Sequence, residues 1–181
     1  MVTIFRIGHR INRDKRITTH LVLVARAFGA DKTIIAGEED KNLLNTINKV
    51  TLEWGGNFQL EMIPYIEWKA FIEQWKSEND KRIVHLTMYG ENLSTFERSR
   101  DFSTMRKRLE NLLIVVGGEK IPRKIFHYAD WNIAISNQPH SEVSSLAVFL
   151  DHLNPKALQI QFKKAHKQII PSLEGKKEYF G

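Results

Sequence analysis

The stretch WNIAISNQPHSEVSSLAVFLDHL, residues 131–153, joins an apolar strand pattern to an amphipathic helix pattern through a dense polar turn. The run WNIAIS has the composition of a buried strand. After the turn, apolar residues recur at the spacing i, i+3, i+4, i+7 that defines one helix face. A strand followed directly by such a helix is the repeating unit of α/β proteins. The residues of this face are Val143, Leu146, Ala147 and Leu150.

The polar turn SNQPHSE, residues 136–142, contains more donors and acceptors than a helix start needs. One side chain, from Ser141 or Asn137, is enough to cap the helix, and Pro139 fits the first turn. The remaining polar groups have no role in capping. Capping therefore leaves the excess of donors and acceptors unexplained.

Short β-branched runs alternate with helical patterns through most of the chain, at a spacing of roughly 25 residues. This alternation predicts an α/β fold with a mostly parallel sheet and helices on both faces. The expected strands are 2–7, 32–37, 58–63, 82–87, 112–117 and 131–136. The expected helical segments are 18–29, 38–56, 64–79, 92–110 and 122–129.

Residues near two helix ends have types that commonly begin or terminate helices. Thr18 and Thr19 are predicted to cap the first helix. Gly29 and Gly55 occupy places where a left-handed residue ends a helix. Beyond Asn154, the chain is predicted to form an extension, residues 154–181, with a helix at 156–166 and a short strand at 167–171.

Composition limits the class of protein. The 181 residues are expected to form one main domain, residues 1–153, followed by this extension. No apolar run approaches the length of a membrane span, and without cysteine there is neither a disulfide nor a thiolate metal site. The seven histidines lack metal-ligand spacing, so no metal is expected. A cytoplasmic protein follows as the default.

The net charge of +6 favours a polyanionic partner, and the positive charge is clustered. The densest cluster, residues 6–16, begins at the end of the first strand and continues into the segment GHRINRDKRITTH, residues 8–20. We expect this segment to be a strand-to-helix loop, which is where α/β proteins place their sites. The basic residues are Arg6, Arg10, Arg13, Lys15 and Arg16.

A glycine pair, Gly117 and Gly118, ends the most apolar strand. Such a pair is either a tight turn or a place where backbone amides approach a ligand closely. The dinucleotide fingerprint G-x-G-x-x-G and the Walker lysine motif are both missing. A nucleotide-like cofactor must therefore be held in another way.

Taken in order, the segments GHRINRDKRITTH, ARAFGA, HLTMYG, VVGGEKIPR and ISNQPHSEVSSLAVFLD resemble the SPOUT methyltransferases. Within that superfamily they are most similar to the archaeal tRNA (cytidine-56) 2′-O-methyltransferases. The resemblance covers residues 2–153. It implies a C-terminal trefoil knot, tRNA as substrate, a homodimer, and S-adenosyl-L-methionine bound in the knotted region. It also explains why no Rossmann fingerprint is present.

Carried over by position, the resemblance assigns the cofactor pocket to three segments. The first is a single residue at the end of the fourth strand, the second is the glycine loop, and the third is the polar turn. The implied cofactor-binding residues are Leu86, Gly117, Gly118, Glu119, Lys120, Ile121, Ile135, Ser136, Asn137, Gln138, Pro139, His140, Ser141 and Glu142.

Related ribose methyltransferases assign the activating role to an arginine of the first motif. Aligning ARAFGA with that motif places Leu23 where the arginine would stand. The catalytic candidates are then Arg10, Arg13 and Arg16, presented by one subunit to the site of the other. A guanidinium keeps its proton far above neutral pH, so an arginine that clamps phosphate is the easier role. The proton acceptors left are Glu119, His140 and Ser141.

Two other interpretations remain open at this stage. One is a non-catalytic RNA-binding α/β protein that uses the basic residues as an electrostatic surface. The other keeps the fold and changes the target to another site in tRNA. The glycine pair together with the polar turn favours the enzyme, because phosphate binding alone requires neither.

Overall fold

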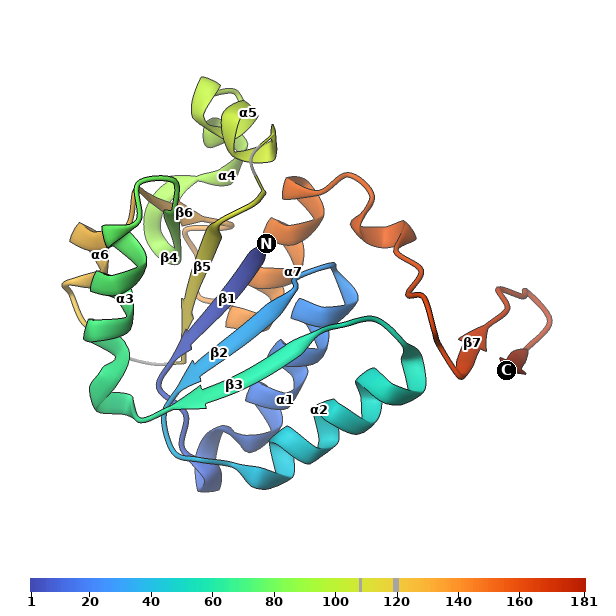
Figure 1. Ribbon diagram of the computed structural model, residues 1–181. Coiled ribbons are helices and arrows are strands. Elements are labelled where there is room, and N and C mark those ends of the chain that lie inside the picture. Colours follow the sequence, from blue (N-terminus) through green and yellow to red (C-terminus); the bar gives the residue numbers. More distant parts are fainter. Residues whose placement is uncertain (108, 119–120) are drawn as a thin grey trace.

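In the computed structural model, which describes residues 1–107, 109–118 and 121–181, six parallel strands form one sheet (Figure 1). The strand order is β3-β2-β1-β5-β4-β6. The strands are β1 (Val2–Ile7), β2 (Lys32–Ala36), β3 (Gln59–Ile63), β4 (Arg82–Asn92), β5 (Leu112–Gly117) and β6 (Trp131–Ala134). All six expected strands are confirmed, but β4 continues to Asn92, beyond the predicted end at residue 87, and β6 ends at Ala134, before the predicted end at residue 136.

Helices cover both faces of the sheet, as predicted. One face packs against α1 (Ile11–Ala27), α2 (Lys41–Trp54) and α7 (Glu142–Leu153), and the other against α3 (Trp68–Ser77) and α6 (Ile125–Tyr128). The short helices α4 (Leu93–Phe96) and α5 (Arg100–Lys107) follow β4. Two 3₁₀ turns, η1 (Tyr65–Glu67) and η2 (Ala157–Gln159), precede α3 and follow α7.

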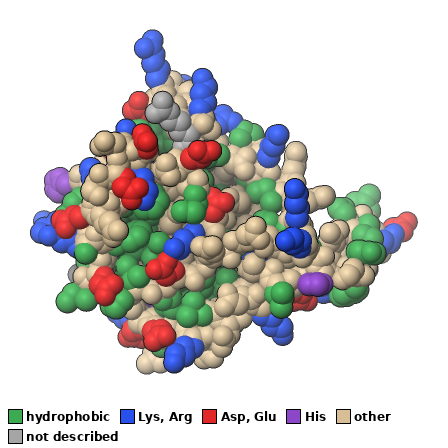
Figure 2. Space-filling model, in the orientation of Figure 1, with side chains coloured by type: hydrophobic (Ala, Val, Ile, Leu, Met, Phe, Trp, Pro, Cys, Tyr) green, Lys and Arg blue, Asp and Glu red, His purple; other side chains and the backbone are tan. Residues whose placement is uncertain are grey.

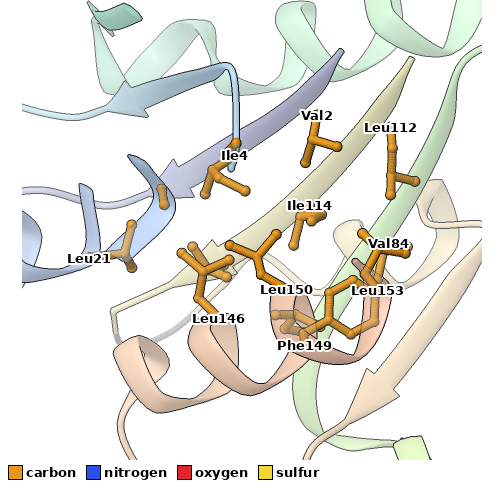
Figure 3. Close-up of a cluster of buried hydrophobic side chains, with 14 of the residues drawn as sticks. Val2, Ile4, Leu21, Val84, Leu112, Ile114, Leu146, Phe149, Leu150 and Leu153 are labelled. Carbon is orange, nitrogen blue, oxygen red and sulfur yellow. The ribbon is translucent and has the colours of Figure 1, made fainter. Parts of the chain in front are cut away.

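The central strands are apolar throughout because they are buried on both faces. In β5 every residue from Leu112 to Val116 is at most 1% exposed. The expected apolar face of α7 packs on this sheet, with Leu146, Leu150 and Leu153 against Ile4 and its neighbours (Figure 3). Each such buried side chain contributes about 1.5–3 kcal/mol. The helix predicted from residues 143–150 is therefore confirmed, and its packing holds the polar turn at the end of β6.

The first helix begins earlier than predicted. α1 starts at Ile11, so most of the segment 8–20 is helical and not a loop. Its first turn is satisfied by two carboxylates: the amide of Arg10 donates to Asp14 (3.1 Å) and that of Ile11 donates to Glu38 (2.8 Å). Thr18 is buried mid-helix, so the predicted Thr18/Thr19 cap is wrong. The cap comes from Glu38, which no local pattern could place there.

The C-terminal segment is a hairpin and an extended arm, and the predicted helix at 156–166 is wrong beyond η2. Ile160 and Phe162 pack with period two: Ile160 lies against Gly29, and the guanidinium of Arg26 lies 4.4 Å from the Phe162 ring centre. This packing favours an extended chain. The predicted strand is confirmed as β7 (Lys167–Ile169), which pairs antiparallel with β8 (Glu178–Phe180).

The hairpin extends away from the sheet and carries exposed apolar side chains, and Figure 2 shows hydrophobic groups gathered on it. On the same face of the main body, lysine and arginine side chains are interspersed with acidic ones. Among the described residues, no helix combines the length and apolar character needed to cross a membrane.

Candidate active site

The site lies at the carboxyl edge of the sheet, where the chain direction changes. β1 and β5 are neighbours, with Ile7 opposite Gly117. The chain leaves β1 toward α1 on one face and leaves β5 toward α6 on the other. In open parallel sheets, a crevice forms at the carboxyl end of two strands whose connections diverge in this way.

A cavity of about 1020 Å³ lies at this edge. Three segments far apart in the sequence contribute to it: the end of β4, the glycine loop after β5 with α6, and the polar turn before α7. Its lining residues are His85, Leu86, Thr87, Met88, Tyr89, Gly117, Gly118, Ile121, Arg123, Phe126, His127, Pro139, His140, Glu142 and Ser145. A volume of this size is that of a small-molecule or cofactor site.

One wall of the cavity is formed where the end of β4 crosses β6. The pairing of these strands shifts register between Leu86 and Glu91, so the intervening residues bulge out of the ladder. Asn137 fixes this bulge, because its side-chain amide donates to the carbonyls of Met88 (2.8 Å) and Gly90 (3.3 Å). The polar turn thus supports the cavity wall as well as facing the cavity.

An ion pair between a buried arginine and a partly exposed glutamate holds the start of α7. The guanidinium of Arg6, fully buried on β1, lies 3.3 Å from a carboxylate oxygen of Glu142 and donates to the carbonyl of Gly8. Burial lowers the pKa of Arg6, and Glu142 opposes that shift. A Cβ built on Gly118 would lie 3.1 Å from this guanidinium. Arg6 therefore links the ends of β1 and β5 to the first turn of α7.

Ser141 is the N-cap of α7, and its hydroxyl accepts a hydrogen bond from the amide of Val143 (3.2 Å). Of the two caps that the sequence allowed, the structure uses Ser141. Pro139 stands before the helix and lines the cavity, so its expected place in the first turn is wrong. This position leaves His140 and Glu142 facing the cavity.

Half of the predicted cofactor residues come together around the cavity: Leu86, Gly117, Gly118, Ile121, Pro139, His140 and Glu142. Five others, Ile135, Ser136, Asn137, Gln138 and Ser141, belong to the same turn but do not line it. Glu119 and Lys120 lie outside the described residues. The assignment of all fourteen residues to the cofactor stays a prediction.

The three predicted catalytic arginines lie at the start of α1 and are exposed. The side chains of Arg10 and Arg13 both approach Asp14, at 3.5 and 4.0 Å. Arg10 lines a second cavity of about 430 Å³, and none of the three is among the described residues that line the large cavity. These arginines could act at the large cavity only if a second subunit presented them to it.

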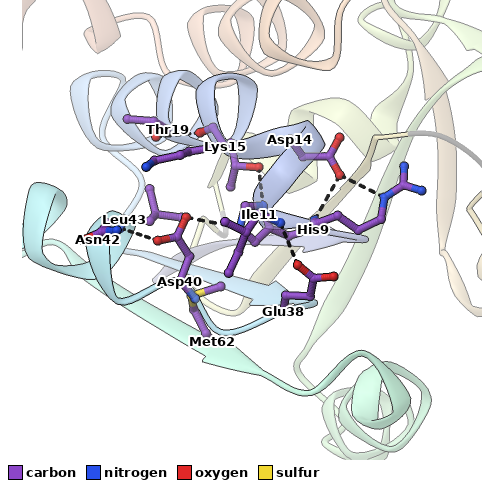
Figure 4. Close-up of polar contacts among 12 residues, drawn as sticks. His9, Ile11, Asp14, Lys15, Thr19, Glu38, Asp40, Asn42, Leu43 and Met62 are labelled. Carbon is purple, nitrogen blue, oxygen red and sulfur yellow. Dashed lines mark hydrogen bonds and ion pairs between the residues drawn. The ribbon is translucent and has the colours of Figure 1, made fainter.

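His9 lies beside these arginines, but it is buried and structural (Figure 4). Its Nδ1 is 2.9 Å from the hydroxyl of Thr18, and its Nε2 is 3.6 Å from a carboxylate oxygen of Asp40. Asp40 also caps α2 by accepting from the amide of Leu43 (3.0 Å). Burial and then the charge of Arg6 lower the pKa of His9.

Several residues that line the cavity were not predicted as site residues. His85, Tyr89, Arg123 and Phe126 stand out, Tyr89 because it is 78% exposed at the cavity edge. The segments HLTMYG and VVGGEKIPR contained three of them and were the only signal available. Among the described residues, no group of three or more histidine and acidic side chains is arranged to hold a metal.

The family model described as "tRNA ribose 2′-O-methyltransferase, aTrm56" matches residues 54–179. A curated relative from Thermococcus kodakarensis, named tRNA (cytidine(56)-2′-O)-methyltransferase, is 49% identical, covering 98% of this chain and 96% of its own. This chain belongs to the aTrm56 family. The resemblance inferred from the motifs is confirmed, and the interpretation as a non-catalytic RNA-binding protein is not supported.

Two solved structures show the same fold at low identity. An RNA 2′-O ribose methyltransferase aligns with TM-score 0.59 at 16% identity, covering 83% of this chain and 54% of that one. The SpoU methyltransferase AviRb from Streptomyces viridochromogenes, in complex with the cofactor AdoMet, aligns with TM-score 0.56 at 13% identity, covering 84% and 56%. The aTrm56 chain thus spans about half the length of these proteins.

Proposed function

We propose that this protein transfers the methyl group of S-adenosylmethionine to the 2′-oxygen of cytidine 56 in tRNA. The bond between the methyl carbon and sulfur breaks, a bond between that carbon and the 2′-oxygen forms, and the hydroxyl proton passes to a base. Membership of the aTrm56 family and the name of the 49% identical relative support the substrate and the reaction. The cavity built from three sequence motifs is the observation that carries the proposal.

The residues around the cavity fit an adenosine-containing cofactor. Leu86, Ile121 and Phe126 give apolar walls for a purine, while the polar turn and Glu142 supply polar groups. A Cβ at Gly117 would lie 2.1 Å from a side-chain carbon of Ile121, so any larger residue would force that side chain to move. Ile121 can therefore fold over the strand end and form part of the cavity lining.

When bound, S-adenosylmethionine supplies the methyl group and leaves as S-adenosylhomocysteine. The chain's own residues bind the cofactor, orient the ribose hydroxyl toward it and exclude water. We assign binding to all fourteen predicted residues, with the polar turn and the glycine loop on either side of the cavity. Holding the ribose hydroxyl in line should supply much of the acceleration, because an oriented reaction avoids the entropy of encounter.

We assign substrate positioning to Arg10, Arg13 and Arg16, acting in a homodimer. Their exposure at the end of α1 allows contact with a second molecule, and a guanidinium is suited to clamp a tRNA phosphate. The proton acceptor would then be Glu119, His140 or Ser141, of which His140 lines the cavity.

We also assign the catalytic unit to residues 1–153 and treat residues 154–181 as an extension. The extension contacts the end of α2, where the amide of Gly56 donates to the carbonyl of Lys163 (3.0 Å). We propose a cytoplasmic location, because tRNA is the proposed substrate.

The test incubates the protein with methyl-labelled S-adenosylmethionine and two tRNA transcripts that differ only in whether nucleotide 56 is cytidine or its 2′-deoxy form. Label incorporated only into the first, in a linkage that resists alkali, supports the proposal. Equal labelling of both, or none of either, overturns it.

Variants Arg10→Ala, Arg13→Ala and Arg16→Ala test the basic residues in the same assay. At least one should reduce turnover by about a hundredfold or more while S-adenosylhomocysteine still binds, since losing an oriented charged contact costs about 3 kcal/mol. Arg100→Ala is the matched control, because Arg100 is also exposed but lies on α5 at the opposite edge of the sheet. Three fully active variants would remove the arginines from the mechanism.

A further inference from the structure

His85 on β4 has one ring nitrogen satisfied within the protein. Its Nδ1 lies 2.8 Å from the side-chain oxygen of Asn132 on the neighbouring strand. The amide nitrogen of Asn132 donates to the backbone carbonyl of Phe126 (3.1 Å), which fixes the orientation of that amide. The Asn132 oxygen can only accept, so Nδ1 of His85 carries the proton.

The other ring nitrogen is therefore an acceptor, and it has no partner among the described residues. Nε2 of His85 is buried, and the residue is 1% exposed. Burial lowers the pKa of His85, so the ring is neutral at pH 7. An acceptor left unpaired in the interior costs about 1–3 kcal/mol. A protein retains such an acceptor where a ligand or an ordered water supplies the missing donor.

The position of the ring shows which ligand it would meet. His85 lines the large cavity together with Leu86 and Phe126. The Phe126 ring lies edge-on to it, with 4.9 Å between centroids and an interplanar angle of 88°, which holds the imidazole in one plane. On β4, Ile83 lies on the same face of the strand as His85, and on β5 the register partner of His85 is Val115; both apolar side chains are fully buried. In such surroundings a neutral donor is cheaper to bury than an ammonium group.

We propose that His85 is a cofactor-binding residue whose Nε2 accepts a hydrogen bond from a neutral donor of the adenosine half of S-adenosylmethionine. This inference rests on the proposed function and adds a binding residue to it. The adenosine half offers two kinds of neutral donor, the exocyclic amine of adenine and the ribose hydroxyls. The methionine half offers an ammonium group, which this environment disfavours.

Calorimetric titration of S-adenosylhomocysteine into the wild-type protein and two variants tests the contact. His85→Asn retains an amide near Nδ1 for Asn132 but has no atom at Nε2, whereas His85→Gln can place its amide oxygen near Nε2. We expect His85→Asn to weaken binding by about tenfold or more, and His85→Gln to recover most of it. Near-equal affinity of wild type and His85→Asn, within a factor of two, would overturn the proposal.

Two further ligands locate the donor. With 5′-methylthioadenosine, which lacks the amino acid, the loss in His85→Asn should persist, and its disappearance would overturn the assignment to the adenosine half. With S-inosylhomocysteine, an oxygen replaces the adenine amine. If S-inosylhomocysteine binds more weakly than S-adenosylhomocysteine to the wild type but not to His85→Asn, the donor is the adenine amine. If His85→Asn weakens the binding of both ligands equally, the donor is a ribose hydroxyl.

A spectroscopic measurement separates binding from a purely structural role. In protein labelled with ¹⁵N-histidine, the Nε2 resonance of His85 should move when S-adenosylhomocysteine binds, while Nδ1 remains protonated. An unmoved Nε2 signal would mean that a buried water, and not the cofactor, satisfies this nitrogen. His166→Asn, in the extension, controls for loss of a histidine. If wild type itself binds no S-adenosylhomocysteine, the proposed function fails, and that result is distinct from failure of the His85 contact.

Discussion

Replacing Gly90 with alanine tests the crossing of β4 and β6 that forms one wall of the cavity. A methyl group there would lie 2.4 Å from the carbonyl oxygen of Asn132 and 2.6 Å from the amide nitrogen of Ile133. Both atoms belong to the backbone of β6, which is paired with β4 and cannot give way as a flexible side chain would. The φ of Gly90 is outside the left-handed region, so the effect is steric alone.

The expected cost follows from two contributions. Forcing a methyl group into a packed region costs about 1–3 kcal/mol. Displacing Gly90 also disrupts the two hydrogen bonds that Asn137 donates to the carbonyls of Met88 and Gly90, each worth about 1 kcal/mol. Together these give a loss of about 3–5 kcal/mol, which for a chain of this size lowers the melting temperature by about 6–20 °C.

Urea denaturation of wild type and Gly90→Ala measures the difference, and calorimetry with S-adenosylhomocysteine measures its effect on the cavity. Gly8→Ala is the matched control, because Gly8 has φ +85° and no atom within 4 Å of a built Cβ. That variant should lose only about 1–2 kcal/mol, from backbone strain. A Gly90→Ala protein with wild-type stability and affinity would refute the steric argument and the proposed rigidity of the crossing.

Three further predictions concern groups that are buried in the fold. Burial lowers the pKa of His9 and His85 below the ordinary 6.5, so the unfolded chain binds more protons at these rings than the folded chain as the pH falls below 6.5. The free energy of unfolding, measured between pH 7.5 and 5.5, should therefore be highest above pH 6.5. Below pH 6.5 it should fall by at most about 1.4 kcal/mol per pH unit for each ring. A slope that His85→Asn leaves unchanged would contradict this. Arg6→Met should lose about 3–5 kcal/mol in urea denaturation because it leaves Glu142 without its charge partner, whereas the double variant with Glu142→Gln should recover part of that loss. Asp40→Ala removes the cap of α2 and should cost about 1–2 kcal/mol by the same measurement, and a neutral effect would show that solvent replaces the cap.

The strands and the polar turn could be predicted because their signals are local. A strand buried on both faces must be apolar along its whole length, so the apolar run 112–117 predicted this strand. The apolar face of α7 was visible for a similar reason, since residues separated by three or four positions share one side of a helix. The ordered motifs likewise identified the family, which the comparison with its model confirmed.

The sequence by itself determined the α/β class, the strand positions and the family, because backbone period and motif order are properties of neighbouring residues. Only the tertiary structure decided which polar groups act together. Glu38 accepts a hydrogen bond from the first turn of α1, from a residue 27 positions away in the sequence. Arg6 forms its ion pair with Glu142, which is 136 positions away. Which ring nitrogen of His85 carries the proton depends on Asn132 and Phe126, which belong to other elements. Hydrogen bonds and ion pairs depend on distances of a few ångströms, and in a folded chain those distances are set by packing between elements that are remote in sequence.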